Sequence, residues 1–281
     1  MATIYKLGSK GEEVKTIQRA LRAAGYQVSI DGDYGQKTMA AVKAFQQSRK
    51  LVPVDGIVGP ATMKELLRAG NTHTPTAPVP AASPAGITIT PAPINTHISF
   101  SVGRQVKYIA IHYTAGRSSR SGMALQTRSV FLQRPASADF VVDDATIVQV
   151  NPDPRNYYCW AVGDKKNPWT GGARLYGKAT NRNTISIEIC STLAAGTSAS
   201  VPNHPGWSFT PQALDNARRL VRHLMQTYGI PRENVIRHYD ATGKLCPGIP
   251  GWNDGPLYQT DGKPASDKSN SQQWQAFLNS L

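Results

Sequence analysis

Apolar residues recur at helical spacing through the first part of the chain. Val14, Ile17 and Leu21 stand three and four positions apart, and Gly25 follows the end of that pattern. Residues 40–51 repeat the spacing. Because apolar positions three and four residues apart line one face of a helix, the pattern predicts amphipathic helices that pack on one another. We expect a compact all-α domain of three helices joined by turns.

The predicted turns carry one motif twice. The pattern D-G-x-x-G-x-x-T occupies residues 31–38 and again residues 55–62. Glycine adopts the positive φ angles of tight turns, and threonine is a favoured residue at the start of a helix. The repeat therefore predicts two equivalent turns, each of which opens the next helix.

Residues 71–96 interrupt the periodicity. They are rich in proline, alanine and threonine and contain no charged residue. Proline at this density favours an extended, semi-rigid spacer. A surface loop inside one domain is the alternative, but structureless loops beyond about 15 residues are uncommon in compact domains. We therefore expect a domain over residues 1–70, a linker over residues 71–96 and a second domain over residues 97–281.

The pattern of the second domain is that of an α/β fold. Short runs rich in β-branched residues predict buried strands, and alternation around Asp143 and Asp144 predicts a hairpin. Thr210-Pro211 is typical of a helix start, and Gly229 of a helix end. The predicted elements are strands at 106–113 and 183–190, a hairpin at 139–150, a helix at 211–228 and a last helix at 271–281. We expect a central mixed β-sheet flanked by helices.

The charge of the chain limits the classes of possible binding partner only when it is considered together with the sequence motifs. A formal net charge of +13 and a pI of about 9.8 predict attraction to polyanions. The sequence has no basic helix with interleaved aromatic residues and no nucleic-acid-binding motif, which favours anionic envelope polymers over specific nucleic acid. No segment approaches the ~20 apolar residues of a transmembrane helix. The first residues lack signal-peptide features, so we expect synthesis in a cytoplasm and another route to any extracellular target.

Three residues have the type and setting of zinc ligands. His112 ends a predicted strand, and His238 precedes Cys246 by eight positions in a segment that becomes a glycine- and proline-rich loop. Catalytic zinc takes three protein ligands and leaves a fourth position for water, and imidazole nitrogen and thiolate sulfur suit it. A single strand histidine is more often a core or surface residue, whereas a packing cysteine is unusual in such a loop. We expect the other two cysteines, Cys159 and Cys190, to be packing residues.

Glu188 interrupts an apolar strand. Alternation places it with Ser186 and Cys190 on the face opposite Ile185 and Ile187. A buried carboxylate is costly unless it is paired or functional, and partial desolvation would raise its pKa toward the range useful for proton transfer. The alternative is an exposed glutamate on a half-solvated strand.

Two resemblances to known families emerge from these motifs. Residues 5–68 resemble the peptidoglycan-binding domain found beside many cell-wall hydrolases, through the opening LGSKGEEVKTIQRALRAAGY and the repeated turn motif. Residues 107–252 resemble the type-2 N-acetylmuramoyl-L-alanine amidases and the related peptidoglycan recognition proteins. The motifs of this second resemblance are IAIHYTAG, FVVDDATIVQ, TISIEI and HYDATGKLCPG. The last is the most specific, because it joins two candidate ligands, a lysine and a Cys-Pro pair in one segment.

The second resemblance implies a zinc enzyme that cuts the amide bond between N-acetylmuramic acid and L-alanine of bacterial peptidoglycan. It implies one Zn²⁺ ion held by His112, His238 and Cys246. Glu188 matches the general base of the family, and Lys244 matches a lysine whose role would be to stabilise an oxyanion. The substrate contacts that we expect are Asp31 and Tyr34 in the first domain and Trp160 and Asn183 in the second.

The chain departs from this family pattern at two places. Ala138 and Asp139 stand where many relatives have a tyrosine or histidine, and residues 160–163 are W-A-V-G where many have W-H-x-G. A tyrosine-assisted mechanism is therefore not expected, which gives Glu188 more of the proton transfer. Residues 164–183, which are basic, glycine-rich and aromatic, fit either a glycan groove or a solvated loop.

Other functions compete with an amidase. A non-catalytic recognition protein of this fold typically lacks the cysteine ligand, which this chain has. A muramidase needs a carboxylate pair across a sugar cleft, and none stands out. The combination of a binding domain and an amidase without a signal peptide resembles phage endolysins, and a bacterial autolysin has the same chemistry. We expect a monomer that acts on the cell wall after release from the cytoplasm.

Overall fold

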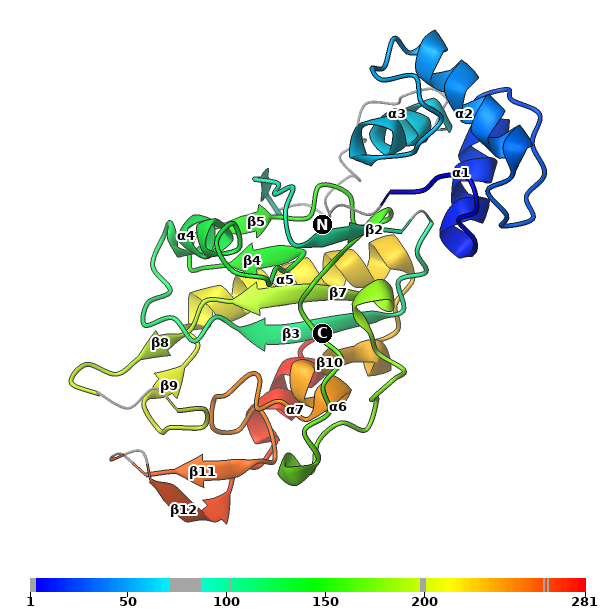
Figure 1. Ribbon diagram of the computed structural model, residues 1–281. Helices are drawn as coiled ribbons and strands as arrows, with labels where there is room; N and C mark the ends of the chain where they lie inside the picture. Colours follow the sequence, from blue (N-terminus) through cyan, green and yellow to red (C-terminus); the bar gives the residue numbers. More distant parts are fainter. Residues whose placement is uncertain (1–3, 71–86, 102, 198–200, 260, 262) are drawn as a thin grey trace. The chain divides into compact units, whose positions relative to one another are not determined.

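The computed structural model describes residues 4–70, 87–101, 103–197, 201–259, 261 and 263–281. The chain divides into two compact units, Met1–Ala81 and Ala82–Leu281 (Figure 1). Each unit has a core of its own. No helix in the described part of the chain is long and apolar enough to cross a membrane.

The first unit is built from three helices, which confirms the predicted all-α domain. They are α1 (Glu12–Ala23), α2 (Gln36–Ser48) and α3 (Pro60–Gly70). The apolar residues that predicted the helices form the core, because their helical spacing turns them all toward the neighbouring helices. Those that are fully buried include Val14, Ile17, Leu21, Val42 and Phe45.

A buried glutamine organises each of the two repeated turns. Gln18, which is 1% exposed, donates to Asp31 Oδ1 at 2.7 Å and to Thr38 Oγ1 at 3.2 Å, and accepts from the backbone N–H of Gly32 at 2.9 Å. Gln46 makes the same three bonds in the second turn. Because an unpaired buried amide or hydroxyl is costly, the repeat in the sequence is a repeat of one hydrogen-bonded structure.

Tyr34 lies inside the first unit, which corrects its assignment as a wall contact. Its side chain is fully buried, and its hydroxyl donates to the carbonyl oxygen of Gly56 at 2.9 Å, which ties the first turn to the second. Asp31 is exposed, but its carboxylate accepts hydrogen bonds from Gln18 and, at 2.9 Å, from the backbone N–H of Asp33. Both residues therefore hold the turns together, and Tyr34 has no surface to offer a glycan.

The second unit is an α/β structure, as predicted. Its strands are β1 (Ile89–Pro91), β2 (Ile98–Phe100), β3 (Tyr108–Tyr113), β4 (Phe140–Val142), β5 (Ile147–Gln149), β6 (Tyr157–Cys159), β7 (Thr184–Ile189), β8 (Thr192–Leu193), β9 (Trp207–Ser208), β10 (Val235–Arg237), β11 (Pro256–Tyr258) and β12 (Pro264–Lys268). Its helices are α4 (Met123–Val130), α5 (Pro211–Tyr228), α6 (His238–Thr242) and α7 (Gln272–Asn279), with short 3-10 helices η1 (Pro168–Thr170), η2 (Asn181–Asn183) and η3 (Arg232–Asn234).

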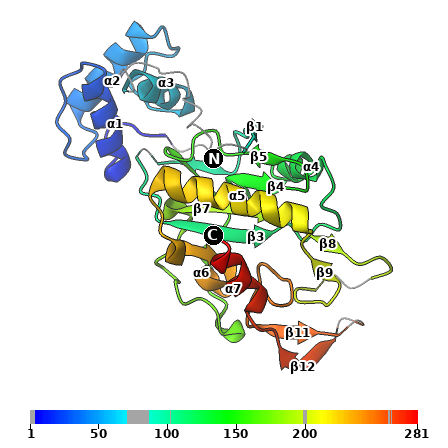
Figure 2. The same cartoon turned by 180° about the vertical axis from the view of Figure 1, so that it is seen from behind.

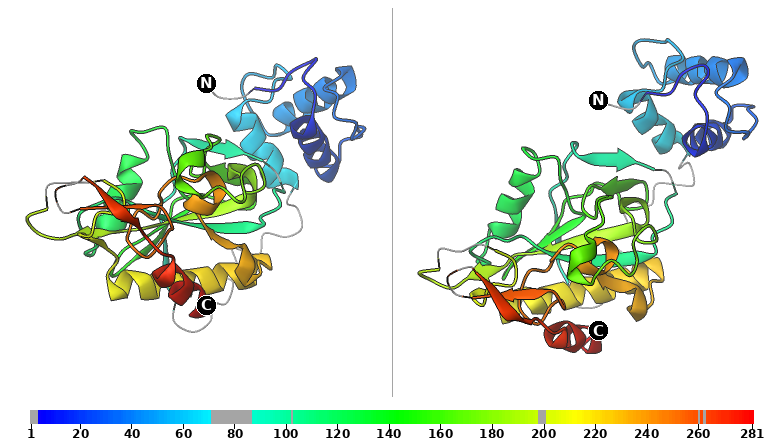
Figure 3. Two further views of the ribbon diagram at one scale, coloured as in Figure 1. Left: turned by 90° about the horizontal axis from the view of Figure 1, so that it is seen from below. Right: turned by 60° about the horizontal axis from the view of Figure 1, so that its bottom comes forward.

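The central sheet has the strand order β1-β5-β4-β7-β3-β10 and is mixed. Its strands pair in parallel except for β4 and β5, which form the predicted hairpin. Helix α5 runs along one face of the sheet with α7 beside it (Figures 2 and 3). Alternate strand residues contact α4 and α6, which lie on the other face. The main core joins α5 to the sheet through Ile109, Ile111, Ile185, Ile187, Leu220, Val221 and Leu224.

Helix α5 begins and ends where its caps predict. The hydroxyl of Thr210 accepts a hydrogen bond from the backbone N–H of Ala213 at 3.1 Å, which satisfies one of the free donors at the helix start. Gly229 ends the helix in the left-handed region with a φ of 64°. The caps therefore position the long helix against the sheet from local sequence alone.

The last part of the predicted linker belongs to the second unit. Ile87 and Ile94 are buried there, and β1 pairs in parallel with β5 at the edge of the sheet. Pro91 ends this strand, which an edge strand tolerates because one of its sides makes no ladder bonds. The high proline and alanine content of residues 71–96 predicted a linker throughout, although its isoleucines form a strand and part of the core. The remainder of the predicted linker, residues 71–86, lies outside the described residues.

Candidate functional site

Parallel strands bring three of the predicted site residues to one edge of the sheet. His112 stands one residue before the end of β3, and Glu188 one residue before the end of β7, where the two are register partners. Strand β10 pairs with the other side of β3 and leads into α6, whose first residue is His238. The carboxyl ends of parallel strands share one edge, which is where open α/β sheets place their ligand sites.

His112, His238 and Cys246 form a buried cluster that can hold a metal ion. Their ligand atoms all lie within 4.8 Å of one another. His112 Nδ1 is 3.1 Å from His238 Nδ1 and 3.7 Å from Cys246 Sγ. Tetrahedral zinc, with nitrogen at about 2.0–2.1 Å and sulfur at about 2.3 Å, requires about 3.4 Å between two nitrogens and about 3.6 Å between nitrogen and sulfur. The cluster therefore has the donors and nearly the spacing of a three-ligand zinc site.

A hydrogen bond decides which nitrogen of His238 faces the cluster. His238 Nε2 lies 2.7 Å from the carbonyl oxygen of Val162, which can only accept, so Nε2 carries the ring proton. The lone pair of His238 Nδ1 is then directed at His112. A backbone carbonyl behind a histidine is a common partner of zinc ligands, because it fixes the orientation and tautomer of the ring.

Burial leaves both histidines neutral at neutral pH. It lowers the pKa of His112 well below 6.5, and it lowers the pKa of His238 to about 4 with further help from the charge of Lys244. Burial also raises the pKa of the Cys246 thiol to about 12, and Glu188 adds to the rise. The imidazole lone pairs are therefore available to a cation, whereas the thiol has to lose its proton when a cation binds.

Glu188 supplies a carboxyl group beside the cluster. The residue as a whole is partly exposed, but its Oε2 atom is buried and has no hydrogen-bond partner in the described part of the chain. Burial raises the pKa of this carboxyl to about 8, and the ammonium group of Lys244 opposes the rise. A carboxyl that changes protonation near neutral pH can take up a proton and return it.

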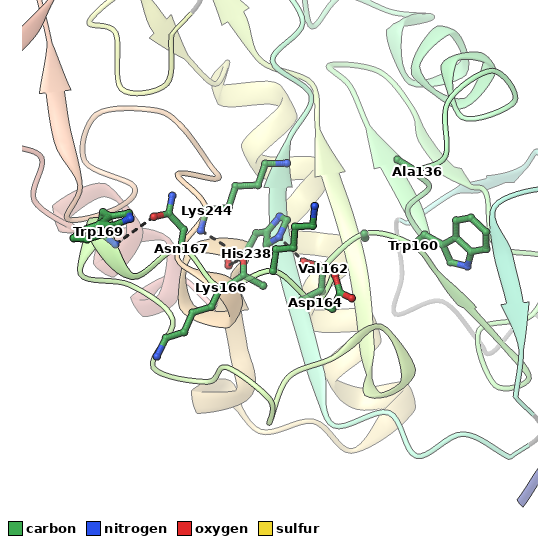
Figure 4. A pocket seen from close by; sticks show the side chains of 13 residues that line it. Ala136, Trp160, Val162, Asp164, Lys166, Asn167, Trp169, His238 and Lys244 are labelled. Atoms are coloured by element: carbon green, nitrogen blue, oxygen red, sulfur yellow. Dashed lines mark hydrogen bonds between the residues drawn. The ribbon is translucent and has the colours of Figure 1, made fainter. Parts of the chain in front are cut away.

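His112, Cys246 and Glu188 line a chamber of about 450 Å³ whose wall also includes Lys244, and His238 lines the adjoining groove. Lys244 is exposed and also borders the adjoining groove, where it lies close to His238 (Figure 4). No ion pair links Lys244 to a carboxylate of the described residues. Its charge therefore faces the space in which a substrate would bind, where it can stabilise developing negative charge.

Comparison with known proteins agrees with this geometry. Residues 102–249 match the N-acetylmuramoyl-L-alanine amidase family, and residues 10–66 match a family of peptidoglycan binding domains. The chain belongs to the N-acetylmuramoyl-L-alanine amidase family. The match covers the three clustered residues as well as Glu188 and Lys244.

Individual relatives of this amidase-family chain match parts of it. The amidase CwlH of Bacillus subtilis is 31% identical over 143 residues, which are 50% of this chain and 46% of the relative. The amidase CwlL of Bacillus licheniformis is 45% identical over 71 residues, which are 24% of this chain and 19% of the relative. The solved catalytic domain of XlyA is 23% identical with a TM-score of 0.45, over 69% of this chain and 99% of that domain. The chain thus spans less than half the length of these two curated relatives.

A buried ion pair holds the start of α6 in this amidase-family domain. Asp240 accepts hydrogen bonds from the backbone N–H of Arg237 at 2.9 Å and from its guanidinium at 2.8 and 2.9 Å. The guanidinium also donates to the carbonyl oxygen of Trp252 at 3.1 Å. His238 stands between the two charged residues, so the pair orients the helix turn that carries this histidine. No pattern in the sequence predicted this ion pair, although Arg237 and Asp240 flank His238 and Tyr239 in the sequence.

A pair of buried asparagines braces the loop that carries Cys246. Asn253 donates to the carbonyl oxygen of Pro247 at 2.8 Å and to Asn203 Oδ1 at 2.7 Å, and it accepts from Asn203 Nδ2 at 2.8 Å. The backbone N–H of Asn203 donates to the carbonyl oxygen of Gly248 at 2.7 Å. Both asparagines are fully buried. Since the two asparagines are 50 residues apart in the chain, no local sequence pattern predicts that they pair.

A lysine groove extends from the chamber. It has a volume of about 680 Å³, and its lining includes Lys165, Lys166, Trp169, His238, Lys244 and Trp160. Figure 4 shows His238 and Lys244 between Trp169 on one side and Trp160 on the other. Trp160 is 41% exposed and borders both the chamber and the groove, as a substrate contact would. Lys165, Lys166, Asn167 and Trp169 thus line a groove, and the choice between a glycan groove and a solvated loop for residues 164–183 stays a prediction.

The structure does not bring Asn183 to this site. The residue precedes β7 and lies at the end of that strand opposite to Glu188, roughly 16 Å away at about 3.3 Å per strand residue. Its side chain accepts from the backbone N–H of Thr180 at 2.9 Å and donates to the carbonyl oxygen of Lys178 at 2.8 Å. Asn183 therefore closes a turn before the strand, and it is not among the residues that line the chamber or the groove.

Proposed function

We propose that this chain is a zinc-dependent peptidoglycan amidase that cleaves the bond between the lactyl carbonyl of N-acetylmuramic acid and L-alanine. The observation that carries the proposal is the buried cluster of His112, His238 and Cys246, together with Glu188, which is the register partner of His112 and lines one chamber with His112 and Cys246. The family match supports the same activity.

Zinc is the metal that the donor set favours. Two imidazole nitrogens and one thiolate, with room for a water molecule, are typical of catalytic zinc. A bound zinc ion would polarise the scissile carbonyl and lower the pKa of a water molecule. The retained Cys246 argues against a recognition protein that has lost its metal.

The proton transfers fall to Glu188. Its buried Oε2, which has no partner among the residues that the structure describes, takes the proton of the attacking water and delivers it to the amine nitrogen of the departing L-alanine. A carboxyl with a pKa raised to about 8 binds that proton more firmly than an ordinary glutamate, and the low polarity of its surroundings keeps the proton in place until the amine accepts it. Lys244 stabilises the negative charge that develops on the carbonyl oxygen.

The first unit would hold the enzyme on its substrate. Its family match supports binding to peptidoglycan, and tethering raises the effective concentration of the catalytic unit at the wall. The net charge of +13 adds attraction to anionic envelope polymers. We further propose that the chain acts as a monomer and reaches the wall after release from a cytoplasm, in the manner of phage lytic enzymes.

The test is digestion of purified peptidoglycan by the wild type and by Cys246→Ser, with products identified by mass. The expected result is release of peptides with a free L-alanine amine, which stops on chelation and returns with zinc, and which Cys246→Ser lacks. Cys190→Ser is the matched control, because Cys190 is an equally buried cysteine packed between α4 and β4. New reducing sugar ends would indicate a glycosidase, and binding without any release would indicate a recognition protein.

A further inference from the structure

The groove continues past Trp160 into a cavity that the proposed reaction does not use. This aromatic basin has a volume of about 760 Å³, and its lining includes Tyr158, Trp160, Asp164, Tyr176 and Arg182. The volume falls within the range of about 300–1,000 Å³ of small-ligand sites. Since Trp160 and Asp164 line both the basin and the lysine groove, a ligand can extend from one into the other.

The aromatic rings of the basin are exposed but fixed. Trp160 and Tyr176 are 41% and 43% exposed. The indole Nε1 of Trp160 donates to Ser99 Oγ at 2.8 Å, and the hydroxyl of Tyr176 donates to the carbonyl oxygen of Asp164 at 2.6 Å. Rings whose polar ends are already bonded present their apolar faces in one orientation. Such preorganised faces bind a ligand with little further loss of conformational entropy.

The loop between the basin and the active site is equally fixed. The backbone N–H of Asn167 donates to Thr242 at 2.7 Å, and that of Ala173 to Tyr239 at 2.9 Å. Both acceptors are carbonyl oxygens of α6, the helix that begins with His238. Trp169, which is 92% exposed, therefore projects from an anchored loop. A large exposed ring on an anchored loop has no structural role that the described contacts reveal, and it faces the lysine groove.

The charges of the two cavities differ. The basin has one acidic and one basic side chain, Asp164 and Arg182, whereas the lysine groove has three lysines against Asp164. The glycan strand of peptidoglycan offers neutral sugars with apolar C–H faces and hydroxyl groups, which suit aromatic rings with a few polar neighbours. The stem peptide carries free carboxylates, which suit a row of lysines.

We propose that the aromatic basin is a saccharide subsite, which holds sugars of the glycan strand next to the muramic acid that is cleaved. The stem peptide then lies in the lysine groove, so the two cavities fix the direction of the substrate across the active site. The inference rests on the proposed function for its substrate, but binding of a sugar chain to the basin does not require cleavage.

The first test is binding of a peptide-free tetrasaccharide of alternating N-acetylglucosamine and N-acetylmuramic acid to the whole chain, followed by the indole N–H signals in NMR spectra. All five tryptophans lie between residues 160 and 274, so glycan held by the first unit does not change these signals directly. We expect a saturable shift of the Trp160 signal and a smaller one of Trp169. A shift of Trp169 alone would overturn the assignment of the basin, and so would no shift of either signal.

The second test uses variants and cleavable substrates of different glycan length. We expect Tyr176→Ala to lower the ratio of kcat/KM for a tetrasaccharide peptide to that for a single muramoyl peptide by about three- to tenfold, the range for one aromatic contact. Tyr176→Phe keeps the ring and should restore most of the ratio, which separates lost stacking from a misfolded loop. Leu125→Ala, at an exposed site on α4 outside the basin, is the control.

Two outcomes separate failure of this inference from failure of the proposed function. Cleavage with an unchanged length ratio in Tyr176→Ala would refute the saccharide subsite and leave the amidase in place. Glycan-dependent shifts of Trp160 without any cleavage would refute the amidase and leave the subsite. The lysine groove is tested in parallel by Lys166→Gln against Lys268→Gln, with amidated and free-carboxylate peptides. Equal loss of kcat/KM on both peptides would refute the peptide assignment.

Discussion

The hydrogen-bonded pair of Asn203 and Asn253 supports the loop that carries Cys246, so a change in this pair should alter both the stability of the second unit and its zinc affinity. Asn253 is fully buried and makes four hydrogen bonds, two with Asn203, one with the carbonyl oxygen of Pro247 and one with the backbone N–H of Gly255. Asn253→Ala removes all four. Because Pro247 directly follows Cys246, the proposed cysteine ligand, the loss should also loosen the loop that carries Cys246.

The size of the effect follows from the groups left without partners. Asn253→Ala leaves Asn203 Oδ1, the carbonyl oxygen of Pro247 and the N–H of Gly255 buried and unpaired. Each such group costs about 1–3 kcal/mol. With each of the three groups near the lower end of that range, the free energy of unfolding of the second unit should fall by about 3–5 kcal/mol. This is a large part of the stability of a domain of this size. Zinc affinity should fall by about 10- to 100-fold, as when a partner that orients a ligand is removed.

The assay is guanidinium unfolding of the metal-free chain, followed by tryptophan fluorescence. This signal reports on the second unit alone, because the first unit contains no tryptophan. Zinc affinity is measured on the same samples by competition with a chelating indicator. Asn279→Ala, at an exposed position in α7, is the control. An unchanged unfolding midpoint would refute the hydrogen-bond count, and lower stability with unchanged zinc affinity would refute the coupling to Cys246.

Four further predictions concern the two units separately. Glu188→Gln should lower kcat by about 10²–10⁴-fold with little change in zinc affinity, since a neutral amide cannot exchange protons; an active variant would exclude Glu188 as the base. Zinc binding at pH 7 should release one proton from the wild type and none from Cys246→Ser, because the buried thiol has a pKa raised to about 12; calorimetry in buffers of different ionisation enthalpy checks this. Gln46→Ala should destabilise the first unit by about 2–4 kcal/mol through the loss of its buried turn bonds, whereas the exposed neighbour Gln47→Ala should change stability by less than about 0.5 kcal/mol, as circular dichroism can measure. The hydrogen bond from the backbone N–H of Ile57 lowers the pKa of Asp55 below 3.8. This carboxylate therefore stabilises the first unit above that pH, and its contribution is lost as the pH falls through the folded-state pKa. An NMR titration of Asp55 with a midpoint above 3.8 would contradict this prediction.

Local patterns in the sequence were enough for the helices of the first unit, for α5 and for the strands that carry His112 and Glu188. Helical spacing predicted the buried faces of α1 and α2, and residue types at Thr210 and Gly229 predicted both ends of α5. Strand alternation placed the side chain of Glu188 on the face opposite its isoleucine neighbours. Family motifs then identified His112, His238 and Cys246, and the parallel register of β3, β7 and β10 explains why these distant segments meet.

The same local patterns misjudged residues whose role depends on distant partners. Tyr34 has the polar tip of a surface residue, but a carbonyl oxygen of the second turn accepts its hydroxyl and allows full burial. The predicted linker contained β1, because its isoleucines pack against strands that follow about 50 residues later.

By itself the sequence determined the periodic faces and the helix caps, since these depend on residues a few positions apart, and its family motifs predicted three residues of zinc-ligand type. Only the tertiary structure decided that Glu188 has a buried oxygen without a partner among the described residues, that Asn203 and Asn253 brace the loop that carries Cys246, and that an aromatic basin adjoins the lysine groove. The physical reason is that the periodic spacing of apolar residues shows which face of a helix or strand is apolar, but it does not show which other segment covers that face. Burial, and with it pKa shifts and cavities, arises between segments that meet only when the chain folds.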